Sequence, residues 1–234
     1  MSGRLGGLKT LIQNEVSSDF YVYCFAHQLQ LALVAAVSCH LDVSSFFGLV
    51  NSIVNIIGCS NKRHKWLRKA QLVHLAELIE QGLGKSGTGS NQQTSLSRAS
   101  DTRWESHYKT LTSIENLFGP VICVLKKILE DTSLKVRGET RTLLQGLLTF
   151  DFIFMLSLMV DVLGVTHLLN LALQRCDQDL LNSLNLVRIV KLRLQRMRDD
   201  GWDILLTKVV EICMNHDIEI PNMTESYYLL KSRR

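Results

Sequence analysis

Two residues near the N-terminus have the types and spacing of a metal site. Cys24 and His27 form a C-x-x-H pair, half of a zinc site, and at a turn into a helix both side chains could reach one ion. A structural zinc needs four ligands, and the next candidates, Cys39 and His40, do not have a matching spacing. We therefore expect Cys24 and His27 to be buried, hydrogen-bonding residues, and we predict no metal ligand.

Three kinds of catalytic site are disfavoured because residues that they require are missing at the necessary positions. Gly84-Lys85-Ser86 lacks the glycine that a phosphate loop needs five residues earlier, where Ile79 stands. A Cys24 nucleophile with His27 as its base has no orienting carboxylate nearby. A two-metal hydrolase needs converging carboxylates, and the only clear strand pattern, residues 20–23, carries none. The residues thus favour a chain that does not catalyse a reaction on its own.

Arg103 and Trp104 stand together where a helix is expected to begin. Thr102 and Glu105 form a capping box, which sets the start of that helix. Backbone N–H groups at a helix start favour anions, and an indole offers a stacking face for a base, so Arg103 with Trp104 suits nucleic acid. The alternative is that Trp104 anchors the helix in the core while Arg103 pairs with a carboxylate.

Basic residues gather in two helical segments. The first set surrounds Trp66 at the start of a helix, where cations oppose the helix dipole, so a phosphate track or a nuclear-import signal competes with a solvated face. The second set lies late in a helix, where cations complement the dipole. The first set is Lys62, Arg63, His64, Lys65, Arg68 and Lys69; the second is Arg188, Lys191, Arg193, Arg196 and Arg198.

Composition indicates an ordinary folded protein. Of 234 residues, 46% are apolar and 21% charged, and the net charge of +4 permits a DNA partner without demanding one. Six cysteines without a C-x-x-C pair, and no signal-peptide pattern, indicate free thiols and the nucleus or cytosol. The apolar stretch 143–173 is interrupted by Asp151 and Asp161, which favours core over membrane.

Apolar spacing predicts a mainly helical chain. Residues 20–23 read as one strand whose sheet partners would lie elsewhere, and residues 82–101 read as a flexible loop. In the helix at 62–81 we expect the apolar residues Leu67, Leu72, Leu75, Leu78 and Ile79 to point inward. The other helices are expected at 5–12, 26–39, 44–57 with Asp42 or Ser44 as its cap, 102–118, 120–131, 134–149, 151–173, 178–199 and 201–216.

Several motifs together resemble the transposases of the hobo/Activator (hAT) superfamily, and among them the plant zinc-finger MYM-type-like group. The likeness extends from Met1 to about Met223. The motifs are Cys24-Phe25-Ala26-His27-Gln28-Leu29-Gln30-Leu31, Leu49-Val50-Asn51-Ser52, Ser100-Asp101-Thr102-Arg103-Trp104, Phe150-Asp151-Phe152, the run from Ala172 to Asp179, and Met197-Arg198-Asp199-Asp200-Gly201-Trp202.

The resemblance implies part of an RNase H-like core followed by a large helical insertion. Such transposases use an Asp-Asp-Glu set with Mg or Mn ions, and the resemblance places those carboxylates, the zinc finger and the dimerisation segment outside this chain. It implies that Cys24 and His27 lie near the family's active site. It also implies that Trp104 stacks on a flipped base, with Arg103 supporting the DNA.

The expected organisation is a partial RNase H-like core at 1–60, a helical insertion at 61–223 containing the loop 82–101, and a divergent tail at 224–234. The tail departs from the family pattern and suggests a truncated or decayed gene product. We expect a nuclear, catalytically incomplete fragment of a transposable-element protein that contacts DNA, without catalytic residues, cofactor, membrane or small-molecule substrate. The alternative is a helical module that binds a related full-length transposase or another protein, or a decayed product without DNA binding.

Overall fold

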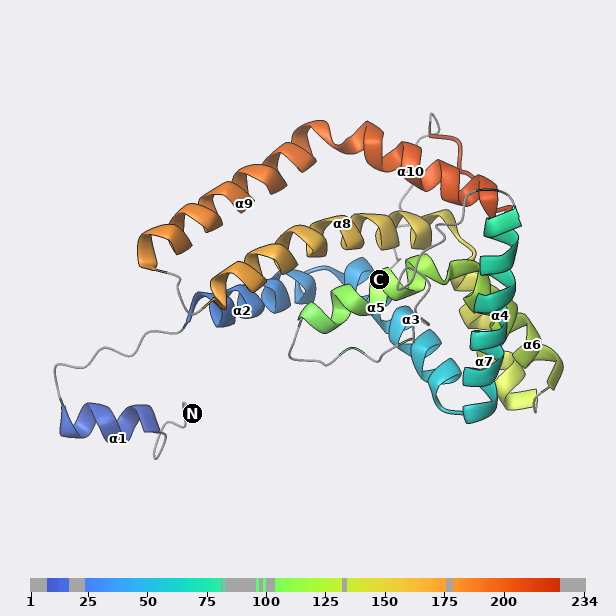
Figure 1. The fold of residues 1–234 in the computed structure, drawn as a ribbon, viewed down its shortest axis with the longest axis horizontal. Helices are drawn as coiled ribbons and strands as arrows, with labels where there is room; N and C mark the ends of the chain where they lie inside the picture. The colour runs from blue at the N-terminus through green and yellow to red at the C-terminus, as the bar shows by residue number, and fades with distance from the viewer. Residues whose placement is uncertain are drawn as a thin grey trace, which may run out of the picture.

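The computed structural model describes residues 8–16, 24–80, 104–131, 134–175 and 179–223, together with residues 82, 96 and 99. Its regular elements are all α-helices, joined mostly by short connections (Figure 1). They are α1 (Leu8–Glu15), α2 (Phe25–Ser38), α3 (Leu41–Gly58), α4 (Asn61–Glu80), α5 (Trp104–Asn116), α6 (Phe118–Asp131), α7 (Leu134–Leu147), α8 (Phe150–Leu173), α9 (Leu180–Asp200) and α10 (Trp202–Asn215).

The prediction of a mainly helical chain is confirmed, and each expected helix is present within a few residues of its expected bounds. The described residues contain no strand. The expected strand at 20–23 and nearly all of the expected loop at 82–101 lie outside the described residues.

Side chains cap the starts of several helices. The Thr149 hydroxyl accepts a hydrogen bond from the Phe152 N–H at 3.2 Å and begins α8. The Asp179 carboxylate accepts from the Asn182 N–H at 2.7 Å and begins α9. Neither Asp42 nor Ser44 caps α3, because that helix already begins at Leu41 and places Asp42 in its first turn. There the Asp42 charge complements the helix dipole instead.

Helix α8 is the centre of the assembly. It packs against α2 and α5 on one side and against α9 and α10 on the other (Figure 1). At one end of the molecule, α4, α6 and α7 pack together, and α3 contacts α4, α7 and α8. The amide of Gln30 in α2 also donates a hydrogen bond to the Asn170 side chain of α8 at 3.2 Å. Helix α2 is thereby fixed to the centre of the bundle.

One cluster of buried apolar residues extends through the bundle from Phe46 in α3 to Ile218 after α10. Ile53, Ile153 and Leu156 are almost fully buried in it, and a buried side chain of this kind contributes about 1.5–3 kcal/mol. Helices on both sides of the boundary expected at residue 60 contribute to this cluster.

The expected inward face of α4 is partly wrong. Leu67 is buried, and Leu75 and Leu78 are half-buried. Leu72 is 55% exposed and Ile79 is 48% exposed. Helix α4 packs mainly against α3 and α6. These two helices cover only a narrow stripe of its surface. The apolar residues of α4 therefore overstate how much of this helix enters the core.

Helices α3 and α8 are long and apolar enough, by length and composition, to cross a membrane. In the folded chain 39% and 50% of their most apolar windows are buried inside the molecule. Core helices pass the same test, and both helices supply residues to the shared core cluster.

Candidate functional site

The first half of α4 carries the basic residues that the sequence singled out. Lys65, Arg68 and Lys69 are exposed, and their spacing of three and four residues places them along one side of the helix. No carboxylate among the described residues forms an ion pair with any of these three. They form a stripe of positive charge that can contact phosphates, and we call it the α4 basic stripe.

Two neighbouring basic residues have structural roles. The Arg63 guanidinium donates to the Ile56 carbonyl and, at 3.1 Å, to the Cys59 sulfur, so it covers carbonyl groups at the C-terminal end of α3. Lys62 forms an ion pair with Asp131 at the end of α6. Of the five lysine and arginine residues of α4 that were predicted to contact DNA, these two form contacts within the fold.

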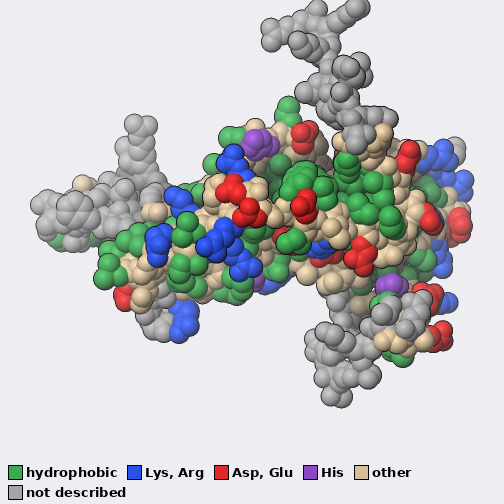
Figure 2. Space-filling model, turned by 90° about the horizontal axis from the view of Figure 1, so that it is seen from above, with side chains coloured by type: hydrophobic (Ala, Val, Ile, Leu, Met, Phe, Trp, Pro, Cys, Tyr) green, Lys and Arg blue, Asp and Glu red, His purple; other side chains and the backbone are tan. Residues whose placement is uncertain are grey.

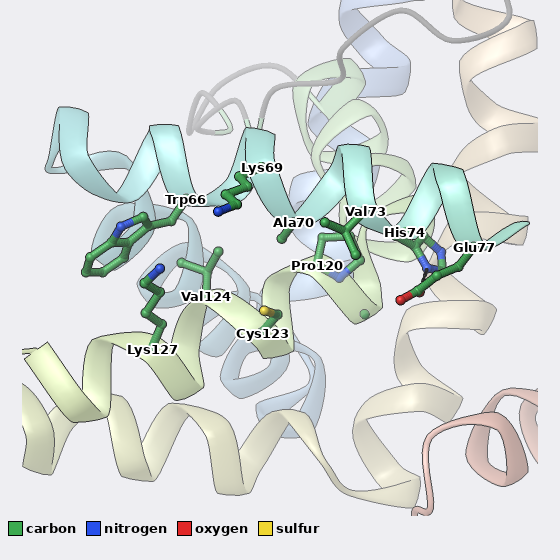
Figure 3. A pocket seen from close by; sticks show the side chains of 11 residues that line it. Trp66, Lys69, Ala70, Val73, His74, Glu77, Pro120, Cys123, Val124 and Lys127 are labelled. Atoms are coloured by element: carbon green, nitrogen blue, oxygen red, sulfur yellow. Dashed lines mark ion pairs between the residues drawn. The ribbon is translucent and has the colours of Figure 1, made fainter.

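A groove of about 360 Å³ lies between α4 and α6, beside the α4 basic stripe (Figure 3). Trp66 closes one end, where the ammonium groups of Lys62 and Lys127 lie 5.0 and 4.9 Å from its ring centroid. Lys69 points into the middle of the groove, and His74 and Glu77 form its other end. Ala70, Val73, Pro120, Cys123 and Val124 supply the remaining lining.

The chemistry of this groove favours an anionic ligand with a flat or apolar part. Lys69 and Lys127 supply charge without a carboxylate partner among the described residues, and Trp66 supplies an aromatic surface. A nucleotide could stack its base on the indole and place its phosphate next to the ammonium groups. At the far end of the groove, the His74 Nδ1 lies 3.9 Å from a Glu77 carboxylate oxygen.

Cys24 and His27 form a helix cap. Cys24 precedes α2, and its sulfur accepts a hydrogen bond from the His27 backbone N–H at 3.3 Å. Both residues are exposed, so the expectation that they are buried is wrong, whereas the expected hydrogen bond is present. No group of three or more His, Cys, Asp or Glu residues that could hold a metal ion occurs within the described part of the chain.

Trp104 is the first residue of α5, and the predicted capping residue Thr102 lies outside the described residues together with Arg103. Glu105 forms an ion pair with Lys109 one turn further along, at 2.7 Å. The predicted DNA contact by Arg103 and Trp104 stays a prediction.

Sequence reasoning missed Lys127. It lies about 60 residues after Trp66, and only the packing of α6 against α4 brings its ammonium to the indole. Lys126 and Lys127 form a plain basic pair in an amphipathic helix, which gave no local signal of a site.

No protein-family model, curated protein or solved structure matches the chain.

Proposed function

We propose that this chain is a transposase-derived, DNA-contacting helical fragment without cleavage activity of its own, and that the α4 basic stripe carries the DNA contact. The hAT-like motifs motivate the transposase origin, including the partial RNase H-like core. The observation that carries the DNA contact is the set Lys65, Arg68 and Lys69, which is exposed and has no ion-pair partner among the described residues. It lies beside a groove lined by Trp66 and Lys127. The proposal places the protein in the nucleus.

Electrostatics explains why such a stripe would bind nucleic acid. A cation without an ion-pair partner gives up only water and counterions when it contacts a phosphate, and the released DNA counterions make the affinity depend on salt. Lys62 and Arg63 would have to break contacts with Asp131 and the Ile56 carbonyl first. The three exposed cations therefore contribute more to DNA affinity than these two.

The test is a titration of a labelled DNA duplex, followed by fluorescence anisotropy at several salt concentrations. A triple variant, Lys65→Gln, Arg68→Gln and Lys69→Gln, should bind at least about tenfold more weakly. Its slope of log affinity against log salt should fall by roughly 0.9 for each phosphate that the variant no longer neutralises. Lys62→Gln alone should have a smaller effect.

The matched control removes the same charge elsewhere, with Arg188→Gln, Arg193→Gln and Arg196→Gln on α9. Equal weakening by both triple variants would show a diffuse charge effect and would contradict the assignment to α4. Absence of any affinity at moderate salt would contradict DNA contact altogether. Arg103→Ala and Trp104→Ala test the second predicted contact in the same titration.

Catalytic incompleteness has its own test. The purified chain should not nick supercoiled DNA in the presence of Mg or Mn. Nicking that increases with the amount of this chain and is abolished by a chelator would overturn that part of the proposal.

A second function, binding another protein, is favoured by the large apolar side chains exposed along α9. They include Leu181, Ile189 and Leu192, each at least half exposed.

A further inference from the structure

Helix α9 is attached to the molecule by one face only. It contacts α8 and α10, and Ser183, at 5% exposed, is its only buried residue. The inward side carries Leu186, Val190 and Leu194, which are half-buried. The opposite side of this helix, about 30 Å long, faces outward from the bundle (Figure 1).

The outward side of α9 is apolar and basic at once. Leu181, Arg188 and Leu192 are spaced by seven and four residues, so they lie on one strip, with Leu184 beside it. Leu181 is 75% exposed, and Leu184 and Leu192 are each about half exposed. In the space-filling view over α9, hydrophobic and basic side chains alternate across the surface (Figure 2).

The charge along most of α9 is of one sign. Residues 180–198 contain five basic residues and no acidic residue. Within the part of the chain that the structure describes, no carboxylate forms an ion pair with any of these five. Asp199, the first acid after them, accepts hydrogen bonds from Gln195 instead. A partner that carries negative charge along with apolar side chains would complement this surface.

Three occupants can be compared by their chemistry. An anionic membrane surface would take up Leu181 and Leu192 and let Arg188 reach the headgroups, but it offers no side chains that interlock with the regular spacing of the leucines. A second copy of α9 would set cations against cations in a parallel pairing. In an antiparallel pairing the cations would face residues 180–187, which hold no carboxylate. An amphipathic helix with leucines along one face and flanking acidic residues satisfies both the leucines and Arg188.

We propose that the outward face of α9, formed by Leu181, Leu184, Arg188 and Leu192, is a docking site for an acidic, leucine-bearing amphipathic helix of another protein. The packing is of coiled-coil type, with leucines against leucines and a partner carboxylate paired with Arg188. This site is on a different helix from the proposed DNA contact and does not depend on it.

The test uses a labelled synthetic helix of the same length as α9, with leucine at its a and d positions and glutamate at its e and g positions. Its binding to the full chain is followed by fluorescence anisotropy near physiological salt. We expect the acidic helix to bind and a version with lysine in place of glutamate not to bind. Leu181→Gln with Leu192→Gln, and separately Arg188→Glu, should each weaken binding at least about tenfold.

Matched variants make the result specific. Leu72→Gln removes an equally exposed leucine from α4 and should leave binding unchanged. A partner helix with lysine only at the position facing Arg188 should restore binding to the Arg188→Glu variant. Because all these side chains are exposed, circular dichroism and melting temperature should not change.

The competing occupants are tested with vesicles containing phosphatidylserine and with a DNA duplex. Failure of the acidic helix to bind overturns the proposal, as does equal binding of the acidic and basic helices. If the chain does not bind the acidic helix but binds vesicles or DNA, and the variant with Leu181→Gln and Leu192→Gln loses that binding, the face is assigned to the membrane or to DNA instead. The triple variant of the α4 basic stripe should bind the acidic helix normally, so failure of the DNA proposal is recognised separately.

Discussion

At the scale of single residues, His216 is a titratable group whose surroundings lower its pKa. It ends α10, and its ring lies edge-on against Phe118, with 4.8 Å between ring centroids. Burial lowers the pKa of His216 below its ordinary value of 6.5, His74 on α4 lowers it further, and Asp217 partly opposes both. A protonated imidazole is therefore disfavoured in the folded protein.

This environment predicts a pH-dependent loss of stability. A base with a lowered folded pKa binds a proton more readily when unfolded, so its contribution is complete above 6.5 and is lost as the pH falls below that value. Wild-type urea midpoints should fall between about pH 7 and pH 5, and His216→Gln should reduce this fall. His74→Gln should reduce it less, because burial of His216 remains. Parallel midpoint curves for wild type and His216→Gln would contradict this reasoning.

Residue types predicted the local roles of side chains better than they predicted contacts with other helices. The hydrogen bond of Cys24 follows from its position three residues before the N–H group that it caps. The role of Arg63 was not predictable in the same way, because its acceptor is the carbonyl of Ile56 at the end of the preceding helix. Its charge was visible in the sequence, but its direction depended on the turn between α3 and α4.

At the scale of elements, the junction of α9 and α10 depends on Gly201. Its N–H donates to the Met197 carbonyl at 3.0 Å, and α10 starts at the next residue. A Cβ atom at this position would lie 2.5 Å from the Met197 carbonyl oxygen, closer than such atoms come in real structures. The glycine permits the change of direction from α9 to α10 without this clash.

Gly201→Ala should therefore destabilise the protein by about 1–3 kcal/mol, because the backbone at Met197 must move. Urea unfolding followed by circular dichroism measures the loss. The control is Gly138→Ala in α7, where nothing lies within 4 Å of the added carbon. There alanine should stabilise the helix by up to about 1 kcal/mol. Similar effects at both sites would show that local space does not decide the result.

Helices were predictable here because their signals are local. Capping residues, the spacing of apolar residues and helix-breaking residues all lie in or next to the helix that they define. Examples are Asp179, which caps α9, and Gly58, at which α3 ends. Which side of a helix is covered depends on its neighbours. Leu72 and Ile79 of α4 stay exposed because α3 and α6 cover only one stripe.

At the scale of the whole molecule, the candidate sites depend on which helices meet. The groove beside the α4 basic stripe exists because α6, some 40 residues further along the chain, packs on α4 and brings Lys127 to Trp66. The docking face of α9 exists because nothing covers the outward side of that helix within the described residues. Neither consequence was readable from the separate segments.

Lys208 joins three helices through one charged group. Its ammonium in α10 lies 2.8 Å from a Glu115 carboxylate oxygen in α5 and 3.5 Å from an Asp161 oxygen in α8. Burial lowers the pKa of Lys208, but the hydrogen bond and charge of Glu115, with a smaller effect of Asp161, raise it above 10.5 overall. Its stabilising contribution is therefore complete at neutral pH and is lost only as the pH rises above that value.

Lys208→Met should cost about 1–2 kcal/mol at neutral pH, because it leaves Glu115, only 21% exposed, without its cation; the exposure of Lys208 itself, 36%, limits the loss. A double-mutant cycle with Glu115→Gln should give a coupling of about 1 kcal/mol that weakens in high salt. The control is Lys109→Met, whose partner Glu105 lies in the same helix, and it should cost less than about 0.5 kcal/mol. Equal losses for Lys208→Met and Lys109→Met would mean that the contact across helices adds nothing to the attachment of α10.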